Sequence, residues 1–456
     1  MSTSHSDGRG REYPAIALAA LLVLHTALVV WPFAANSAAV DFFTFWSVPH
    51  AKSAVPSGDI YSPEGQRALA SRLSSEAQSG AASLTQRRGT ALLKELYGDR
   101  VDVTGSPLLY TLVAGISGGS FDVDAPRYMA FSLIALGLSV LLLCRVLEFG
   151  AVATLLFMAI IASNFSPVIS DVTVGNINSL QLLAVSVFVY GWARNKPALA
   201  GAAIGAGAIL KPTIALVLLF AAVIVLAGRD TRRAVRFAGG VAGAVVVGVG
   251  VSAAYFARLG IWFDFIKSLG RTLGAGAYTI DTGNFSLTSL VFATTGWALG
   301  AFLLVGLTLV GVWLLMIRSS EGRVSDPRRD AFFAAGWGCG AVLLASPLAW
   351  LHYYVLIVPA IFGAVQATSS TGAQSTLWSK IGPMAGVLPI ALLSASAETL
   401  MGNNRRGEAV LVNLAVVVTL AVLARQMWSE RDTDAVPMPS DKGRRAVRSG
   451  RRGRQA

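Results

Sequence analysis

The chain has 456 residues, of which 54% are hydrophobic and only 14% are charged. Because an ordinary soluble domain carries about 25% charged residues, this composition excludes a soluble globular protein and indicates a membrane protein. The net charge of +12 does not indicate nucleic-acid binding, since the basic residues lie in short loops and in the tail Arg444–Arg454, with no interleaved aromatics. A basic tail of this kind is attracted to anionic lipid on the cytoplasmic leaflet.

Apolar runs long enough to cross a bilayer predict an all-α polytopic protein with about twelve transmembrane helices. The transmembrane domain is expected over 14–425, between a cytoplasmic N-terminus at 1–13 and a basic disordered cytoplasmic tail at 426–456. The first apolar run lacks a convincing A-x-A cleavage site, so we interpret it as a retained helix and not as a signal peptide. The expected spans are 14–34, 126–147, 150–164, 178–193, 197–210, 212–228, 237–256, 297–317, 331–346, 352–367, 381–397 and 408–425.

The basic loops set the expected orientation in the inner (plasma) membrane. Basic residues in short loops mark the cytoplasmic side, and here they fall before the first span, around 194–196, 229–236 and 318–329, and in the tail. Both termini are therefore expected in the cytoplasm. Four segments are then exterior: 36–125, 163–178, 257–296 and 346–352. Long loops are usually functional or disordered, so we expect the chemistry on this exterior, periplasmic side. The segment 106–119 is too short to span and is predicted to be an interfacial helix within the first exterior loop.

Asp41 directly follows the first predicted span and stands among aromatic residues. Partial desolvation at such a place would raise its pKa and make it a better proton acceptor. Alternatively, it is a helix-end carboxylate that faces water beside an interfacial aromatic belt. Lys211, with Pro212, interrupts an apolar stretch near the exterior. A lysine at that depth either binds an anion, such as a lipid-linked phosphate, or snorkels to the surface.

Three further polar positions are candidates for substrate binding. Asn176 and Asn178 lie in the sequence GNINS at the start of a predicted helix, where their amides could bind sugar hydroxyls or simply cap the helix. His352 follows SPLAWL and could contact a phosphate or a sugar hydroxyl, or have no role. Asn284, in GNFSL, is a similar amide. Nucleotide-binding loops and clustered metal ligands are absent from the sequence, so neither a metal nor another cofactor is expected.

Several motifs in order resemble a known family. The series is an aspartate after the first helix, then GDIY, SPLLY, GNIN, AGAAIGAGAILKP, NFSL and SPLAWLHYY, over about residues 38–360. It resembles glycosyltransferase family 87, within the GT-C class of membrane transferases. The resemblance implies inverting transfer of mannose, or next arabinofuranose, from a polyprenyl-phosphate donor to an envelope glycolipid or glycan. Asp41 would match the family's general base, Lys211 its lysine near the donor phosphate, and His352 its histidine after S-P-x-x-W.

The sequence departs from the family pattern in ways that bear on the substrates. Ser106–Pro107 stands where the family has two prolines, Gly175–Asn176 stands where glycine–glutamine is usual, and the polar stretch 71–100 resembles an insertion. Two other functions stay open on the residues alone. One is a transporter of lipid-linked sugars or small molecules, although no clear internal repeat supports it. The other is a noncatalytic membrane protein of envelope assembly.

Overall fold

The computed structural model describes residues 13–35, 37, 39–272, 283–320, 326–369, 388–394 and 404–429. Within these ranges every regular element is a helix, and the extended backbone forms only two isolated bridges, Phe165–Ser394 and Asn284–Trp350. The predicted all-α fold is therefore confirmed. Most of the predicted terminal segments and of the predicted span 381–397 lie outside the described residues, and positions 426–429, predicted as the start of the tail, are helical.

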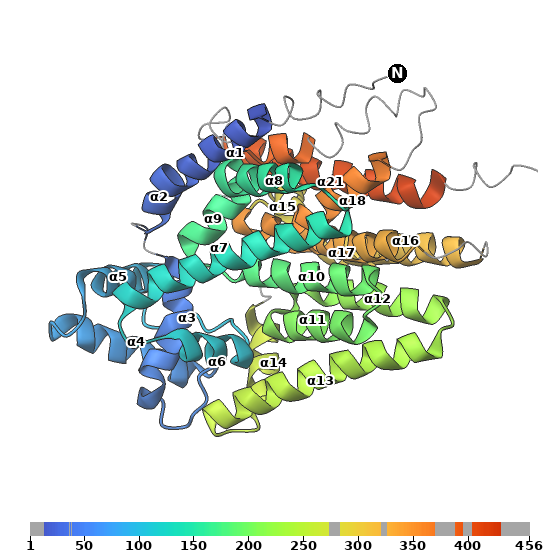
Figure 1. Cartoon of the computed structure of the whole chain (residues 1–456). Helices are drawn as coiled ribbons and strands as arrows, with labels where there is room; N and C mark the ends of the chain where they lie inside the picture. Colours follow the sequence, from blue (N-terminus) through green and yellow to red (C-terminus); the bar gives the residue numbers. More distant parts are fainter. Residues whose placement is uncertain are drawn as a thin grey trace, which may run out of the picture.

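Most helices lie side by side in one bundle (Figure 1). The first helix runs through α1 (Tyr13–His25), a π-helical turn (Thr26–Val30) and α2 (Trp31–Ala35). The other bundle helices are α7 (Phe121–Val146), α8 (Ala151–Asn164), α9 (Ser166–Val174), α10 (Asn178–Ala193), α11 (Pro197–Leu210), α12 (Ala215–Ala227), α13 (Thr231–Phe256), α15 (Leu287–Thr295), α16 (Gly300–Ser320), α17 (Pro327–Ala345), α18 (Val358–Ser369) and α21 (Arg405–Ser429). Two 3-10 segments, η4 (Pro212–Ile214) and η5 (Leu351–Ile357), lead into α12 and α18.

Five of these helices are long and apolar enough to cross a membrane: Tyr13–Val30, Phe121–Val146, Thr231–Phe256, Gly300–Ser319 and Arg405–Met427. Six shorter apolar helices accompany them, among them α8, α10 and α11. The chain is accordingly a helical membrane protein, and the count of about twelve spans stays a prediction. Four helices begin three or more residues earlier than predicted, α7 at 121, α13 at 231, α17 at 327 and α21 at 405. Asp230 and Asp326 cap α13 and α17 by accepting from backbone N–H groups, which extends these helices beyond their apolar runs.

The region between α2 and α7, predicted as one long exterior loop, contains four helices. They are α3 (Val40–Ala51), α4 (Pro63–Gln78), α5 (Leu84–Tyr97) and α6 (Pro107–Ile116), which we call the α3–α6 lobe. The polar stretch 71–100 thus lies mostly within the α4–α5 hairpin. A serine side chain caps α4, α5 and α6 by accepting from the backbone three residues later: Ser62, Ser83 and Ser106. The helix predicted near 106–119 is present as α6, while its place at the membrane surface stays a prediction.

Aromatic side chains form the core of this lobe. Phe42, Phe43 and Trp46 of α3 are almost completely buried. Phe42 stacks on Tyr128 of α7 at 4.3 Å between ring centroids, and the Trp46 indole donates to Asp124 at 3.1 Å. The aromatic run beside Asp41 is therefore packed inside the protein, not spread as an interfacial belt. These contacts anchor α3 to the long helix α7.

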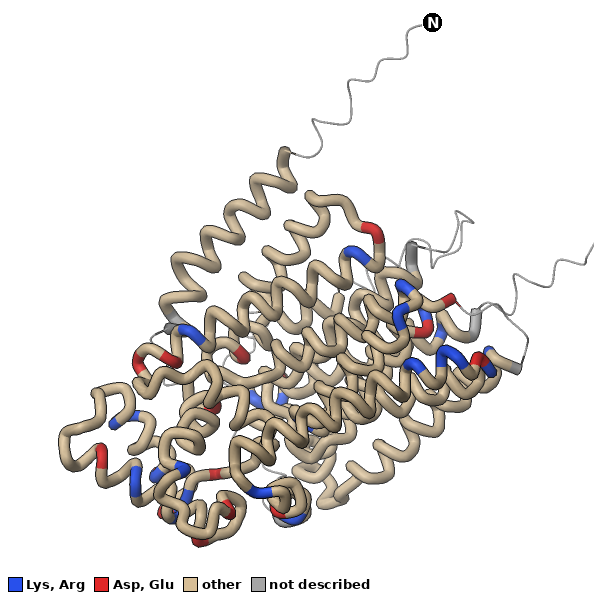
Figure 2. Tube along the Cα trace, turned by 60° about the horizontal axis from the view of Figure 1, so that its bottom comes forward, with Lys and Arg blue, Asp and Glu red and all other residues tan. Residues whose placement is uncertain are grey.

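The two ends of the bundle differ in structure. The α3–α6 lobe and α14 (Ile261–Thr272) lie at one end, and the short α7–α8, α10–α11 and α12–α13 connections lie at the other (Figure 1). Charged residues concentrate at both ends, and long stretches between them carry none (Figure 2). At the end with the short connections, Arg318 and Asp330 form a buried ion pair at 3.0 Å that joins α16 to α17.

Candidate functional site

Asp41 lies in the first turn of α3, at the junction between the lobe and the bundle. Ala39 precedes the helix in a left-handed conformation, and Ser37 donates to the Thr173 carbonyl of α9 at 2.5 Å, which fixes the chain where it enters α3. The Asp41 side chain keeps 32% of its surface exposed, whereas Phe42 and Phe43 beside it are buried. The packed neighbours thus hold the carboxylate in place and leave it accessible.

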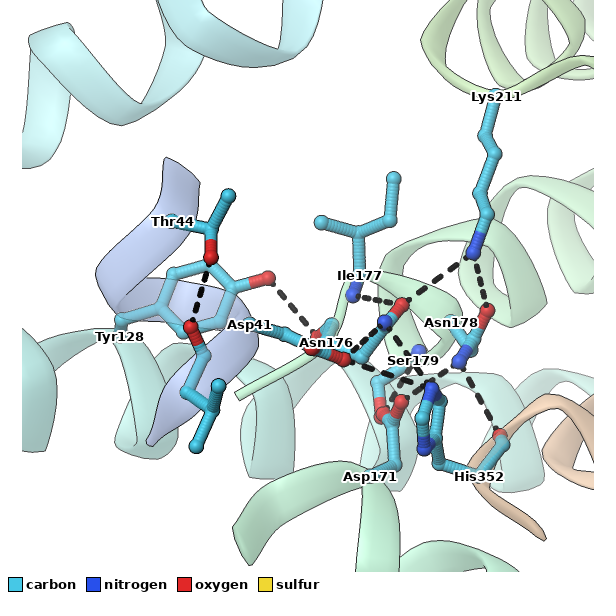
Figure 3. Close-up of polar contacts among 11 residues, drawn as sticks. Asp41, Thr44, Tyr128, Asp171, Asn176, Ile177, Asn178, Ser179, Lys211 and His352 are labelled. Carbon is cyan, nitrogen blue, oxygen red and sulfur yellow. Dashed lines mark hydrogen bonds and ion pairs between the residues drawn. The ribbon is translucent and has the colours of Figure 1, made fainter. Parts of the chain in front are cut away.

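Asn176 joins Asp41 to the bundle through both ends of its amide (Figure 3). Its Nδ2 donates to Asp41 Oδ2 at 2.6 Å, and its Oδ1 accepts from the Lys211 Nζ at 3.4 Å. The turn between α9 and α10 that carries Asn176 requires a glycine. Gly175 has φ +69°, and a Cβ there would approach the Phe42 Cβ to 2.6 Å. The absence of a side chain at position 175 therefore lets the Asn176 turn pack directly against α3.

Asn178 provides the second contact to the lysine. Its Oδ1 accepts from Lys211 Nζ at 3.3 Å, and its Nδ2 donates to Asp171 Oδ1 at 2.9 Å and to the His352 carbonyl at 3.1 Å. Asp171 also accepts from the Ser179 hydroxyl at 2.6 Å and the Ser179 N–H at 3.1 Å. Asp171 thus orients the start of α10. Burial raises the pKa of Asp171 to about 7, although these hydrogen bonds act in the opposite direction.

Lys211 lies at the break between α11 and α12, with an extended backbone between the two helices. Gln181 donates to its carbonyl at 3.1 Å, and the Ser106 hydroxyl donates to the preceding Leu210 carbonyl at 2.8 Å. The ammonium lies 4.0 Å from the centre of the Tyr353 ring, a cation–π distance. The lysine therefore points into the same cluster as Asp41 (Figure 3) and not away along the helix surface.

His352 completes the group from the start of η5. Its Nε2 lies 3.4 Å from Asp41 Oδ2 and 3.2 Å from Asn176 Nδ2. Asp41, Asn176, Asn178, Lys211 and His352, predicted one by one, are thus in one hydrogen-bonded cluster, which we call the Asp41 cluster. The hydroxyl of Tyr128 supports it by donating to the Asn176 carbonyl at 2.9 Å.

Asn284, the sixth candidate, makes its hydrogen bonds in a different place. It donates to Ser289 at 2.7 Å and to the Pro347 carbonyl at 2.8 Å, and it accepts from the backbone of Ser286 at 3.1 Å and Ala349 at 2.9 Å. These bonds hold the turn that precedes His352. Its predicted part in substrate binding stays a prediction.

Two residues of the lobe stand close to Asp41 although the sequence did not single them out. Asp102 lies between Val101 and Val103, which are both buried in the lobe core. Burial, together with the negative charge of Asp41, raises the pKa of Asp102 to about 6. Burial and the charges of Asp102 and Asp41 also raise the pKa of Tyr97. Asp102 and Tyr97 thus lie within electrostatic range of Asp41.

The protonation of Asp41 depends on its burial and on two neighbouring residues. Burial in the surrounding protein raises its pKa, while the hydrogen bond from Asn176 and the positive charge of Lys211 lower it in part. An accessible carboxylate with a raised pKa is suited to take a proton from a hydroxyl group. The nearby ammonium is suited to bind an anionic group such as a phosphate. The arrangement can therefore activate a hydroxyl and stabilise a leaving anion in one place.

The family comparison places the chain in a class of enzymes. The model of glycosyltransferase family 87 matches residues 104–336, about half of the chain. The matched region contains Asn176, Asn178, Lys211 and Asn284, and it lies between Asp41 and His352. No curated protein and no solved structure matches the chain.

Proposed function

Because the chain belongs to glycosyltransferase family 87 and is a membrane glycosyltransferase, we propose that it takes its sugar from a polyprenyl-phosphate donor. Mannose is our first candidate for the sugar and arabinofuranose the second. The acceptor is a hydroxyl group of an envelope glycolipid or glycan on the exterior face of the inner membrane. The donor's lipid chain stays in the bilayer while its phosphate and sugar enter the Asp41 cluster.

One observation carries this proposal most directly: the same Asn176 amide binds both Asp41 and Lys211. A proton acceptor and a cation, 170 positions apart in the sequence, are thereby held side by side. Transfer of an activated sugar needs both, because one substrate must lose a proton while the other leaves as an anion.

In the proposed mechanism, Asp41 accepts the proton of the acceptor hydroxyl as its oxygen attacks the anomeric carbon. The bond between that carbon and the phosphate oxygen breaks, and the electron pair leaves with the polyprenyl phosphate. Lys211 binds the leaving phosphate, and His352 and the amides of Asn176 and Asn178 bind phosphate or sugar oxygens. Attack from the face opposite the leaving group inverts the anomeric configuration.

The proposal is tested with the purified full-length protein in lipid nanodiscs. The protein is incubated with polyprenyl-phosphate mannose or polyprenyl-phosphate arabinofuranose and a lipid extract, and products are identified by mass spectrometry. We expect an acceptor that gains one sugar residue only when a lipid-phosphate sugar is supplied. Formation of the same product from a nucleotide sugar alone would refute the donor class.

A further inference from the structure

A cavity of about 310 Å³ opens beside the C-terminal end of α3, at the turn between α13 and α14. Its lining includes two cationic side chains, Lys52 and Arg258, and the glycine Gly58, where a Cβ would have no heavy atom within 4 Å. Asp41 and Lys52 are 11 positions apart along nearly one helix, so at 1.5 Å per residue the cavity lies roughly 16 Å from the Asp41 cluster. It is therefore a separate site.

The two cations are held in position but keep free hydrogen-bonding capacity. The Lys52 ammonium donates to the Tyr255 carbonyl at 2.8 Å and lies 3.8 Å from the centre of the Tyr255 ring. Arg258 donates to the Ser57 carbonyl at 3.0 Å and pairs with Asp264 at 2.8 Å. A lysine has three N–H donors and an arginine five, so most of their donors remain available to a ligand. One acidic partner against two cations leaves the cavity suited to an anion.

An uncovered apolar stripe begins directly beside this cavity. Leu259, Phe263 and Ile266 are 84%, 67% and 61% exposed. Phe263 and Ile266, three positions apart, lie on one face of α14, and Leu259 is in the turn before this helix. The opposite face is buried: Ile261 and Phe265 pack into the lobe core, with Phe265 5.6 Å from the Tyr61 ring centre. A helix with one packed face and one exposed apolar face is typical of the membrane interface.

We propose that this cavity binds the phosphate of an anionic phospholipid, whose acyl chains lie along Leu259, Phe263 and Ile266. A free phosphate ion would use only Lys52 and Arg258, whereas a phospholipid uses the cations and the adjoining apolar stripe together. Figure 1 shows α14 beside the end of α13, at the same end of the bundle as the α3–α6 lobe. The site would hold the lobe against the lipid surface beside the Asp41 cluster.

The test compares lipids on the delipidated, full-length protein. Retention of phosphatidylglycerol and of phosphatidylcholine is measured by native mass spectrometry, and inorganic phosphate is added as a competitor. We expect phosphatidylglycerol to be preferred and Lys52→Gln to weaken its retention about fivefold, the effect of about 1 kcal/mol per basic residue at an anionic surface. Lys52→Arg should keep the preference. Lys94→Gln removes an exposed lysine of α5 elsewhere on the lobe and is the matched control.

Three results would overturn the lipid site. The first is equal retention of both lipids by the parent protein. The second is equal retention of phosphatidylglycerol by Lys52→Gln and Lys94→Gln. The third is displacement of phosphatidylglycerol by millimolar inorganic phosphate. Because Leu259 and Phe263 are exposed, Leu259→Ser/Phe263→Ser should fold and weaken retention of phosphatidylglycerol while all charges are kept; unchanged retention would exclude the acyl-chain stripe. Sugar transfer by the same samples is measured separately, so loss of the lipid site and loss of the proposed function are distinguishable.

Discussion

At the scale of single residues, the candidate site depends on the pKa of Asp41, which burial raises and neighbouring polar groups lower. Surrounding protein disfavours its ionised form, while Asn176 and Lys211 favour it. The residue sequence indicated Asp41, Lys211 and His352 as separate candidates, because charged or titratable side chains beside apolar runs are costly without a role. It did not indicate Asp102, because nothing in its local sequence places that segment beside Asp41.

This balance predicts a pH dependence. Only ionised Asp41 can accept a proton, so kcat/KM should rise with pH through its pKa, at a higher pH than for an exposed aspartate. Lys211→Met removes the positive charge that lowers this pKa, so the acid limb should move to still higher pH, in addition to a loss of rate. The measurement is the pH profile of kcat/KM for sugar transfer. Lys94→Met, at an exposed position of α5, should leave the limb in place.

If the acid limb of the kcat/KM profile of Lys211→Met lies at the same pH as in the parent, or at a lower pH, then Lys211 does not act electrostatically on the titrating base. The profile therefore tests the contact between the two residues apart from the effect on rate.

At the scale of the elements, the α9–α10 turn decides whether Asn176 reaches α3. Part of this could be predicted: GNINS indicated a helix start, and α10 begins at Asn178. The contact between Gly175 and Phe42 could not be predicted, because it joins two segments more than 130 positions apart in the sequence. The α4–α5 hairpin is a similar case. Its polar composition suggested an insertion, yet Ser62 and Ser83 are in the usual N-cap positions and mark the starts of both helices.

Gly175→Ala tests this element. Alanine is destabilising here for two reasons: the backbone is left-handed, and the added Cβ would lie 2.6 Å from the Phe42 Cβ. Together they should destabilise the protein by about 2–5 kcal/mol, or displace α3 and lower turnover. Gly80→Ala is the control, since Gly80 has φ +79° and nothing within 4 Å of a Cβ. It should cost only about 1–2 kcal/mol. Equal melting temperatures and turnover for the two variants would show that the close packing is unimportant.

At the scale of the whole molecule, the proposed function requires that the two ends of the bundle face different compartments. The arrangement of helices agrees with the predicted division, because the lobe lies at one end and three short connections lie at the other. Apolar length and loop charge in the sequence predict two such ends, and the compartment that each end faces stays a prediction. It could not predict the packed lobe, whose core is built from helices that are short or polar.

Cysteine labelling tests this orientation. The native Cys144 and Cys339 are both buried, so neither should react with a water-soluble maleimide in the folded protein. A single cysteine at Asp99, on the lobe, should react with a membrane-impermeant maleimide from the exterior. One at Arg232, at the start of α13, should react only after the membrane is permeabilised. Both positions are exposed. Labelling of both from the same side would contradict the proposed topology.

The proposed function requires Asp41 to act as the base of the sugar transfer, and the turnover of Asp41→Asn decides whether it does. The variant keeps the size of the side chain but cannot accept the proton, so we expect transfer from the lipid-phosphate donor to fall about 10²–10⁴-fold while the melting temperature stays close to that of the parent. Asp99→Asn, which neutralises an exposed aspartate of the lobe, should retain full activity. Near-normal turnover of Asp41→Asn in the same assay would contradict the account.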